Sequence, residues 1–255
     1  MIPKLVAFDL DGTLAVSKQA IISPITELLG QLLEQSKVAI ISGGKFEQLE
    51  LQVAEKLPET AVLDNLYILP TSGAALYTHK NGTWIQVYEK TIASSEAEHI
   101  GKVLAEAVAE TKVLQDSPTL YGPQIEYRGN AAVAFSALGQ LAPPGVKLAW
   151  DPTHEKRQIL REAVALRLPS YDVKVGGATT IDITQSGVNK AFGMRELSKH
   201  LNIPIEDMVY IGDALFPGGN DEVVKETNIK AISVTDPIET ARVIESLLHE
   251  ASTPE

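Results

Sequence analysis

Two short apolar runs near the N-terminus constrain the fold more than any other feature of the sequence. Residues 4–8 (KLVAF) and 37–41 (KVAII) show no alternation of polar and apolar side chains, so neither predicted strand has a face in water. A glycine-containing turn follows each run, and an amphipathic stretch with helical spacing follows each turn, at residues 25–33 and 46–56. This order predicts a parallel sheet with helices on both faces.

The pattern changes in the middle of the chain. Residues 74–77 and 83–88 predict a hairpin around Asn81 and Gly82. Residues 141–145 (LAPPG) predict a loop. Further strands are predicted at residues 125–128, 131–138, 171–175 and 179–183, with helices at 95–108 and 155–168.

The first pattern returns with a predicted helix at residues 190–201 and strands at 208–211 and 231–234. We therefore expect an α/β protein with a Rossmann-like parallel core. The core would comprise residues 1–81 and 186–255, and an α+β domain would be inserted at residues 82–185.

Composition excludes several classes of partner. The formal net charge of −11 argues against binding to nucleic acid or to an anionic membrane surface, and an anionic substrate would need cations gathered locally. The absence of cysteine excludes disulfides and thiolate metal sites. Because no run reaches about 18 apolar residues and no secretion signal is evident, we expect a cytoplasmic protein that does not enter the membrane.

Polar residues gather where the predicted parallel strands end. Asp9 and Asp11 follow the first strand, Ser42 and Gly43 the second, and Asp213 the strand at residues 208–211. In open α/β sheets, ligands bind at this edge. Because side chains alternate along a strand, we expect Asp9 and Asp11, two residues apart, to point the same way. Two such carboxylates ~4 Å apart repel by about 4 kcal/mol at an effective dielectric constant of about 20, so we expect a divalent cation with oxygen ligands to offset them.

In order and residue type, these segments resemble the four motifs of the haloacid dehalogenase superfamily of phosphotransferases. Residues 9–13 (DLDGT) match the first motif, Ser42 the second, and Lys190, at a predicted helix start, the third. Asp213 with Asn220 and Asp221 matches the fourth. The length and position of the insert are similar to the type IIB cap of this superfamily.

The resemblance implies phosphoryl transfer through an aspartyl-phosphate. Asp9 would be the nucleophile, and Asp11 would give a proton to the leaving oxygen and later take one from water. Lys190, Ser42 and the amide of Gly43 would face the charge of the phosphate.

The resemblance also implies a Mg²⁺ ion. Asp9, Asp213 and the main-chain carbonyl of Asp11 would bind the ion. Asp221 and Asn220 would complete the surroundings of the metal or of Lys190.

Within the superfamily, the chain resembles the eukaryotic-type phosphomannomutases most, in residues 125–128 (IEYR) and in the spacing of residues 212–221 (GDALFPGGND). This resemblance implies a homodimer through the cap and a sugar-phosphate substrate. Arg128 and Lys147 would hold a phosphate, Lys18 would stand in place of an arginine, and Thr180 and Asp182 would contact sugar hydroxyls.

Several positions depart from the mutase pattern. Gln140 replaces a phosphate-binding arginine, and lysine at positions 18 and 147 lacks the bidentate fork of arginine. Ser42 fits the superfamily better than the mutases, which tend to have glycine there. We therefore favour a Mg²⁺-dependent hexose-phosphate phosphatase, a hydrolase. The alternatives are a phosphomannomutase that interconverts mannose 1-phosphate and mannose 6-phosphate, and a non-catalytic sugar-phosphate-binding domain.

Overall fold

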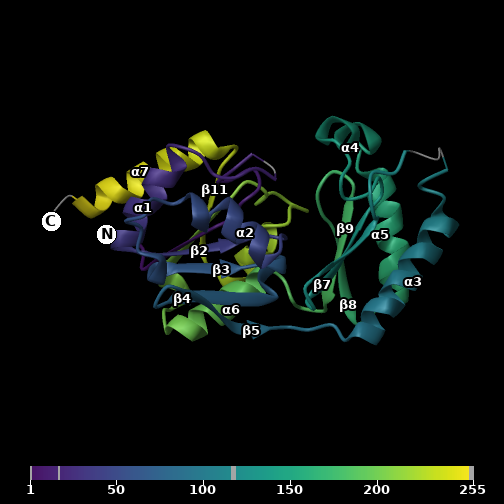
Figure 1. The fold of residues 1–255 in the computed structure, drawn as a ribbon, viewed down its shortest axis with the longest axis horizontal. Helices are drawn as coiled ribbons and strands as arrows, with labels where there is room; N and C mark the ends of the chain where they lie inside the picture. Colours follow the sequence, from purple (N-terminus) through teal and green to yellow (C-terminus); the bar gives the residue numbers. More distant parts are fainter. Residues whose placement is uncertain (1, 17, 116–118, 253–255) are drawn as a thin grey trace. The chain divides into compact units, whose positions relative to one another are not determined.

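The fold is described by a computed structural model that covers residues 2–16, 18–115 and 119–252 (Figure 1). The chain forms two compact units. The first contains Met1–Glu89 and Asn189–Glu255, and the second contains Lys90–Val188. Within the described ranges, no helix is both long and apolar enough to cross a lipid bilayer.

A seven-stranded sheet forms the centre of the first unit, in the order β11-β10-β1-β2-β3-β4-β5. The strands from β11 to β3 run parallel, whereas β4 pairs antiparallel with both β3 and β5. The strands are β1 (Leu5–Phe8), β2 (Lys37–Ile41), β3 (Leu66–Leu69), β4 (Ala75–Lys80), β5 (Thr83–Glu89), β10 (Met208–Gly212) and β11 (Lys230–Ser233). The helices are α1 (Ile25–Gln35), α2 (Phe46–Gln52), α6 (Lys190–Leu201) and α7 (Pro237–Ser252), with short 3₁₀ helices at Ala54–Lys56, Leu63–Asn65, Thr71–Gly73, Ile205–Asp207 and Glu222–Thr227.

Alternate residues of each central strand pack on opposite faces of this sheet. In β1, Val6 and Phe8 belong to the core that contains α1, α2 and α7, whereas Leu5 and Ala7 belong to the core that contains α6. Because both faces are buried, the strands are apolar throughout, as the sequence predicted. The same period of two places Asp9, the next odd-numbered residue, on the α6 side.

The sequence placed the boundary of the insert at residue 82, but the chain enters the second unit after Glu89. The reason is that β5 pairs with β4 along its length and so extends the core sheet. The return also differs, since the second unit continues to Val188 instead of residue 185.

The second unit is an α+β domain with an antiparallel four-stranded sheet in the order β6-β7-β9-β8. Its elements are β6 (Ile125–Arg128), β7 (Ala132–Ser136), β8 (Tyr171–Val175), β9 (Thr180–Gln185), α3 (Ser94–Thr111), α4 (Pro144–Trp150) and α5 (Glu155–Arg167). One face of the sheet packs on α3 and α5 through residues such as Val133 and Ile183. The opposite face has Glu126, Ala134, Asp182 and Lys174 in one row across the four strands. Helix α4 begins inside the expected loop at residues 141–145, because Pro144 occupies its first turn.

A close contact between two glycines brings the start of α6 against the sheet. A Cβ atom on Gly193, in the second turn of α6, would lie 2.9 Å from the Cα of Gly73 and 2.9 Å from the Cδ1 of Ile41. Gly73 itself has a φ of +91°, which favours glycine. These glycines therefore let α6 approach the loop after β3 closely enough for Lys190 to reach the sheet edge.

We expect Gly193→Ala to lower the free energy of unfolding by about 1–3 kcal/mol, although alanine favours helices, because its Cβ would overlap the Cα of Gly73, a backbone atom that cannot easily move aside. Gly101→Ala is the matched control: it also lies within a helix, and the nearest atom to its Cβ would be the hydroxyl oxygen of the exposed Tyr127 side chain, at 3.3 Å. The control should be neutral or gain up to about 1 kcal/mol. Urea denaturation of both variants measures this, and equal stabilities would contradict the importance of the contact.

Candidate active site

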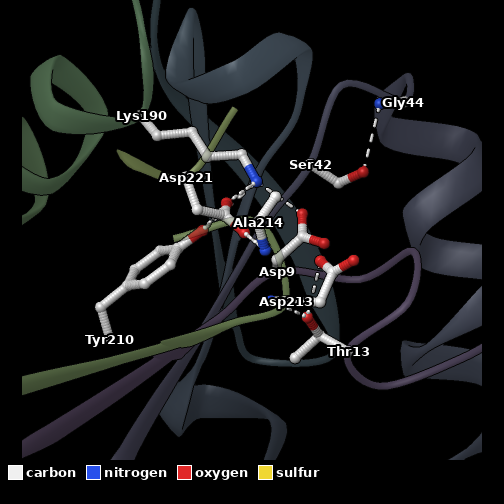
Figure 2. A network of polar contacts seen from close by, with 9 residues as sticks. All are labelled: Asp9, Thr13, Ser42, Gly44, Lys190, Tyr210, Asp213, Ala214 and Asp221. Atoms are coloured by element: carbon white, nitrogen blue, oxygen red, sulfur yellow. Dashed lines mark hydrogen bonds and ion pairs between the residues drawn. The ribbon is translucent and has the colours of Figure 1, made fainter. Parts of the chain in front are cut away.

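Four chain segments meet at the carboxyl edge of the parallel strands. Asp9 directly follows β1, Ser42 follows β2, Asp213 follows β10, and Lys190 is the first residue of α6. Figure 2 shows their side chains around one small region. The structure therefore brings together the polar residues that the strand pattern placed at this edge.

Lys190 lies at the centre of this cluster. Its Nζ atom is 2.5 Å from the Oδ1 of Asp9 and 2.5 Å from the Oδ1 of Asp221. The side chain of Asn189 caps α6 by accepting a hydrogen bond from the amide of Phe192, which fixes the helix start. A buried lysine at a helix N-terminus is unfavourable for both burial and the helix dipole, so the two carboxylates must compensate for it.

Asp221 is fully buried and accepts hydrogen bonds on both oxygen atoms. Its Oδ1 accepts from Lys190 and from the hydroxyl of Tyr210, which is 2.5 Å away. Its Oδ2 accepts from the amide of Ala214 at 3.1 Å. A Cβ on Gly212 would lie 2.5 Å from this Oδ2, so only glycine leaves room for the carboxylate there. Three protein donors thus hold the carboxylate of Asp221, and Lys190 is the charged one among them.

Asp213 is paired with Thr13 of the first motif. The amide of Asp213 donates to the Thr13 Oγ1 at 3.0 Å, and the Thr13 hydroxyl donates to the Asp213 Oδ1 at 3.3 Å (Figure 2). Gly12, with a φ of +89°, lies against the same carboxylate, because a Cβ there would be 2.5 Å from its Oδ2. Residues 12 and 13 therefore fix the position of Asp213, 200 residues later in the sequence.

The loop after β2 is held by a second loop. The carbonyl groups of Ser42 and Gly44 accept hydrogen bonds from the amides of Ser72 and Thr71, both 2.8 Å long. Thr71 and Ser72 have φ values of 48° and 58°, in the left-handed region that is unfavourable for threonine. The loop at residues 71–73 is thus strained where it holds Ser42 and Gly44, the residues on either side of Gly43.

Three carboxylates are close enough to share a metal ion. Among the described residues, Asp9, Asp213 and Asp221 each offer one oxygen atom, all within 4.8 Å of one another. Hard oxygen donors of this kind fit Mg²⁺. The carboxylate of Asp11 is not in this group and accepts a hydrogen bond from the amide of Lys18 at 2.5 Å. Strand β1 ends at Phe8, so the period of two that would have aimed Asp9 and Asp11 alike does not extend to Asp11.

Burial and the crowding of like charges shift the ionisation of this cluster. Burial, reinforced by the charges of Asp221 and Asp213, raises the pKa of Asp9 to about 7, although Lys190 opposes the shift. The pKa of Asp213 is raised for the same reasons, burial first and Asp221 second. Burial disfavours charged Lys190, but Asp9 and Asp221 outweigh it and raise the pKa of the ammonium group above its usual value. The lysine therefore stays cationic.

Five of the expected substrate-binding residues lie in the second unit, in two groups. The guanidinium of Arg128 is 3.0 Å from the Oδ1 of Asp182 and 3.3 Å from the Oε2 of Glu126. The Nζ of Lys147 donates to the main-chain carbonyl of Gln140 at 2.9 Å. Thr180 faces Ser136 across β7 and β9, near Asp182. Lys18, by contrast, is exposed in the first unit.

The sequence analysis assigned no role to two residues of the site. Thr13 was matched as part of a motif without a role, and Tyr210 was placed only in a strand. A signal for Tyr210 exists, because a tyrosine within an otherwise aliphatic buried strand needs a partner for its hydroxyl group. Burial, with the charges of Asp221 and Asp9, raises the pKa of Tyr210 well above its usual value, so the hydroxyl keeps its proton and donates it.

Curated relatives align with almost the whole chain. A phosphomannomutase of Encephalitozoon cuniculi is 27% identical over 247 residues, which cover 94% of this chain and 92% of the relative. A probable phosphomannomutase of Caenorhabditis elegans is 25% identical over 256 residues, which cover 96% of each chain. At this identity, the relatives indicate common ancestry without settling the reaction.

Solved structures share the fold. The IMP-bound, N-terminally truncated IMP-nucleotidase of Plasmodium falciparum superposes with a TM-score of 0.67 at 18% identity, over 97% of this chain and 68% of that one. A trehalose-6-phosphate phosphatase related protein gives 0.53 at 18% identity, over 97% and 98%. The family model for haloacid dehalogenase-like hydrolases matches residues 6–221. The protein therefore belongs to the haloacid dehalogenase-like hydrolases and is an enzyme of their phosphatase and phosphomutase type.

Proposed function

We propose that this protein is a Mg²⁺-dependent phosphatase that hydrolyses sugar monophosphates through an aspartyl-phosphate on Asp9. The observation that carries the proposal is the buried contact of Lys190 with Asp9 and Asp221 beside Asp213. Such a cluster joins a nucleophilic carboxylate to a fixed positive charge, and phosphoryl transfer needs both. The cytoplasmic location and the cap-to-cap homodimer stay predictions.

Asp9 has the role of nucleophile in this proposal. Lys190 binds its Oδ1, so we assign the attack on phosphorus to Oδ2. The attack forms an O–P bond and breaks the bond from phosphorus to the ester oxygen of the sugar. A nucleophile must be ionised, and a pKa near 7 means that Asp9 depends on nearby positive charge to be so.

Asp11 would move the protons. It would protonate the sugar oxygen as it leaves, and would then take a proton from the water that attacks the phosphorus of the aspartyl-phosphate. The second attack releases inorganic phosphate and restores Asp9. The amide of Lys18 donates to the Asp11 carboxylate and would orient it for both steps.

Asp9 and Asp213 would be the main carboxylate ligands of Mg²⁺, along with the main-chain carbonyl of Asp11. When bound, the ion would reduce the repulsion between the attacking carboxylate and the phosphate. Asp221 would serve Lys190 first, since both its oxygen atoms already accept hydrogen bonds from the protein. Ser42 and the amide of Gly43 would donate to the phosphate oxygens.

The contacts within the second unit favour a hydrolase over a mutase. A mutase binds a sugar bisphosphate in two orientations, so its cap must hold a phosphate as firmly as its core does. Here Arg128 is already paired with Asp182 and Glu126, and position 140 carries a neutral glutamine. Asp182 and Thr180 are suited to bind sugar hydroxyl groups.

Phosphomannomutase activity is the second candidate. It is favoured by the names of the two relatives described above and by the end-to-end alignment with them. A non-catalytic sugar-phosphate-binding role has less support, because Asp9, Asp213, Asp221 and Lys190 are all present and lie together.

Incubation with Mg²⁺ and a panel of hexose monophosphates, followed by ³¹P NMR, tests the proposal directly. We expect free phosphate to appear, and Asp9→Asn to lower kcat by about 10³-fold or more because the nucleophile is lost. EDTA should abolish turnover. Asp64→Asn, which removes a carboxylate paired with His79 outside the site, serves as the control and should leave kcat unchanged. Exchange between the 1- and 6-positions without net hydrolysis would instead indicate a mutase.

The raised pKa of Asp9 predicts how stability depends on pH. In EDTA, the folded protein retains a proton on Asp9 between pH ~4 and 7 that the unfolded chain has lost. The free energy of unfolding therefore falls as the pH rises across this range, and the contribution of Asp9 is lost once the pH has passed through 7. Asp9→Asn does not titrate. We therefore expect the variant to melt a few degrees above the wild type at pH 8 and at the same temperature near pH 4.

Added Mg²⁺ should reverse this order at pH 8, because it favours ionised Asp9 in the wild type. Differential scanning fluorimetry across pH, with and without the metal, measures both effects. A variant that melts below the wild type at pH 8 in EDTA would show that the ion pair with Lys190 outweighs the cost of burial.

Gln140→Arg tests the assignment of position 140. A bidentate guanidinium should tighten the binding of a hexose 1,6-bisphosphate by about tenfold, with a smaller effect on a monophosphate. Isothermal titration calorimetry measures both. Gln158→Arg adds the same charge on an exposed position of α5 and should leave both affinities unchanged. Equal effects of the two substitutions would refute a local role for residue 140.

A further inference from the structure

We propose that the hydroxyl group of Tyr210 fixes the direction of the Lys190 ammonium group and so holds Asp9 in place for phosphoryl transfer. Tyr210 is a positioning residue in this proposal, since it acts through Lys190 and Asp221. The effect on turnover rests on the proposed function, whereas the network itself is a property of the fold.

The first step is a count of donors and acceptors. An ammonium group has three N–H donors. Three oxygen atoms surround the Nζ of Lys190: Asp9 Oδ1 and Asp221 Oδ1, each at 2.5 Å, and the Tyr210 hydroxyl at 3.2 Å. Each N–H therefore has its own acceptor, and Tyr210 takes the third. With all three engaged, one N–H stays directed at the nucleophile.

The second step concerns the proton of Tyr210. The tyrosine hydroxyl accepts from Lys190, so its own proton is available for the Oδ1 of Asp221, 2.5 Å away. Lys190, Tyr210 and Asp221 thus form a closed ring of hydrogen bonds, which Figure 2 shows on the side of Lys190 away from Ser42. Within the ring, each group restricts the other two.

The third step is the rigidity of the aromatic ring. Tyr210 is fully buried in the middle of β10, where it pairs in register with Ala7 of β1. A Cβ on Gly212 would lie 2.9 Å from its Cε1, so the ring lies tightly against the backbone. The hydroxyl position is therefore determined by the sheet itself.

Packing alone does not account for the hydroxyl group. Tyr210 belongs to an apolar core cluster that also contains Leu5, Met194 and Leu215, and the ring of phenylalanine would fill the same space. Burying a hydroxyl group is unfavourable unless it is hydrogen-bonded. The partners that compensate for its burial are Lys190 and Asp221.

The test is Tyr210→Phe, which removes only the hydroxyl group. We expect kcat to fall about tenfold, because one N–H of Lys190 and one lone pair of Asp221 lose their partner and the ammonium group can turn away from Asp9. KM should stay within about twofold, since no substrate contact is removed. Tyr67→Phe is the matched control, as Tyr67 is a buried tyrosine of the same core cluster on β3, and it should leave kcat unchanged.

A double-mutant cycle separates positioning from a general loss of stability. If Tyr210 acts through Asp221, Tyr210→Phe should have little further effect on kcat in an Asp221→Asn background. Effects that multiply, or a kcat of Tyr210→Phe within twofold of the wild type, would overturn the proposal.

A second measurement does not depend on turnover or on the folding of a variant. In the wild type, NMR should detect the Tyr210 hydroxyl proton in slow exchange, close to the ε-methylene protons of Lys190. A rapidly exchanging hydroxyl proton would overturn the proposal. If the wild type hydrolyses no phosphate ester, the proposed function fails, and this measurement still decides the role of Tyr210.

Discussion

The contact between one buried ammonium group and two buried carboxylates governs the rest of this structure. Lys190 is 1% exposed and Asp221 is fully buried, so their charges depend on each other, and Asp9, 4% exposed, lies against the same ammonium group. Removing Lys190 would leave buried carboxylates without a counter-charge, which typically costs about 3–5 kcal/mol. The surrounding backbone is accordingly built to keep these groups together.

Three glycines allow the backbone to hold these groups together. Gly12 and Gly212 leave space for the carboxylates of Asp213 and Asp221, and Gly193 lets α6 approach the sheet. In each case a single methyl group would push a site residue or its helix out of position. The arrangement of the active centre thus depends on the absence of a side chain at these three positions as well as on its polar groups.

The sequence predicted the parallel core well, because a strand buried on both faces has an unmistakable apolar pattern. The bounds of β2 and α6 match the structure, and parallel strands necessarily bring Asp9 and Asp213 to one edge. The expectation for Asp11 extended a period of two beyond Phe8, where the strand has ended.

Other features could not be read from the sequence. The hairpin pattern did not reveal that β5 joins the core sheet, since pairing partners far apart in sequence leave no local signal. Helix α4 looked like a loop because prolines at 143 and 144 are typical both of loops and of helix starts. The network of Tyr210 depends on contacts with residues 11 and 20 positions away.

The position of the insert has an evolutionary consequence. Every residue to which we assign the chemistry lies outside Lys90–Val188, and that unit is one uninterrupted stretch of the chain. A single recombination event could therefore exchange this unit without changing any residue to which we assign the chemistry. The downstream junction is the sensitive one, because Asn189 caps α6 directly before Lys190, so a viable graft must preserve that cap.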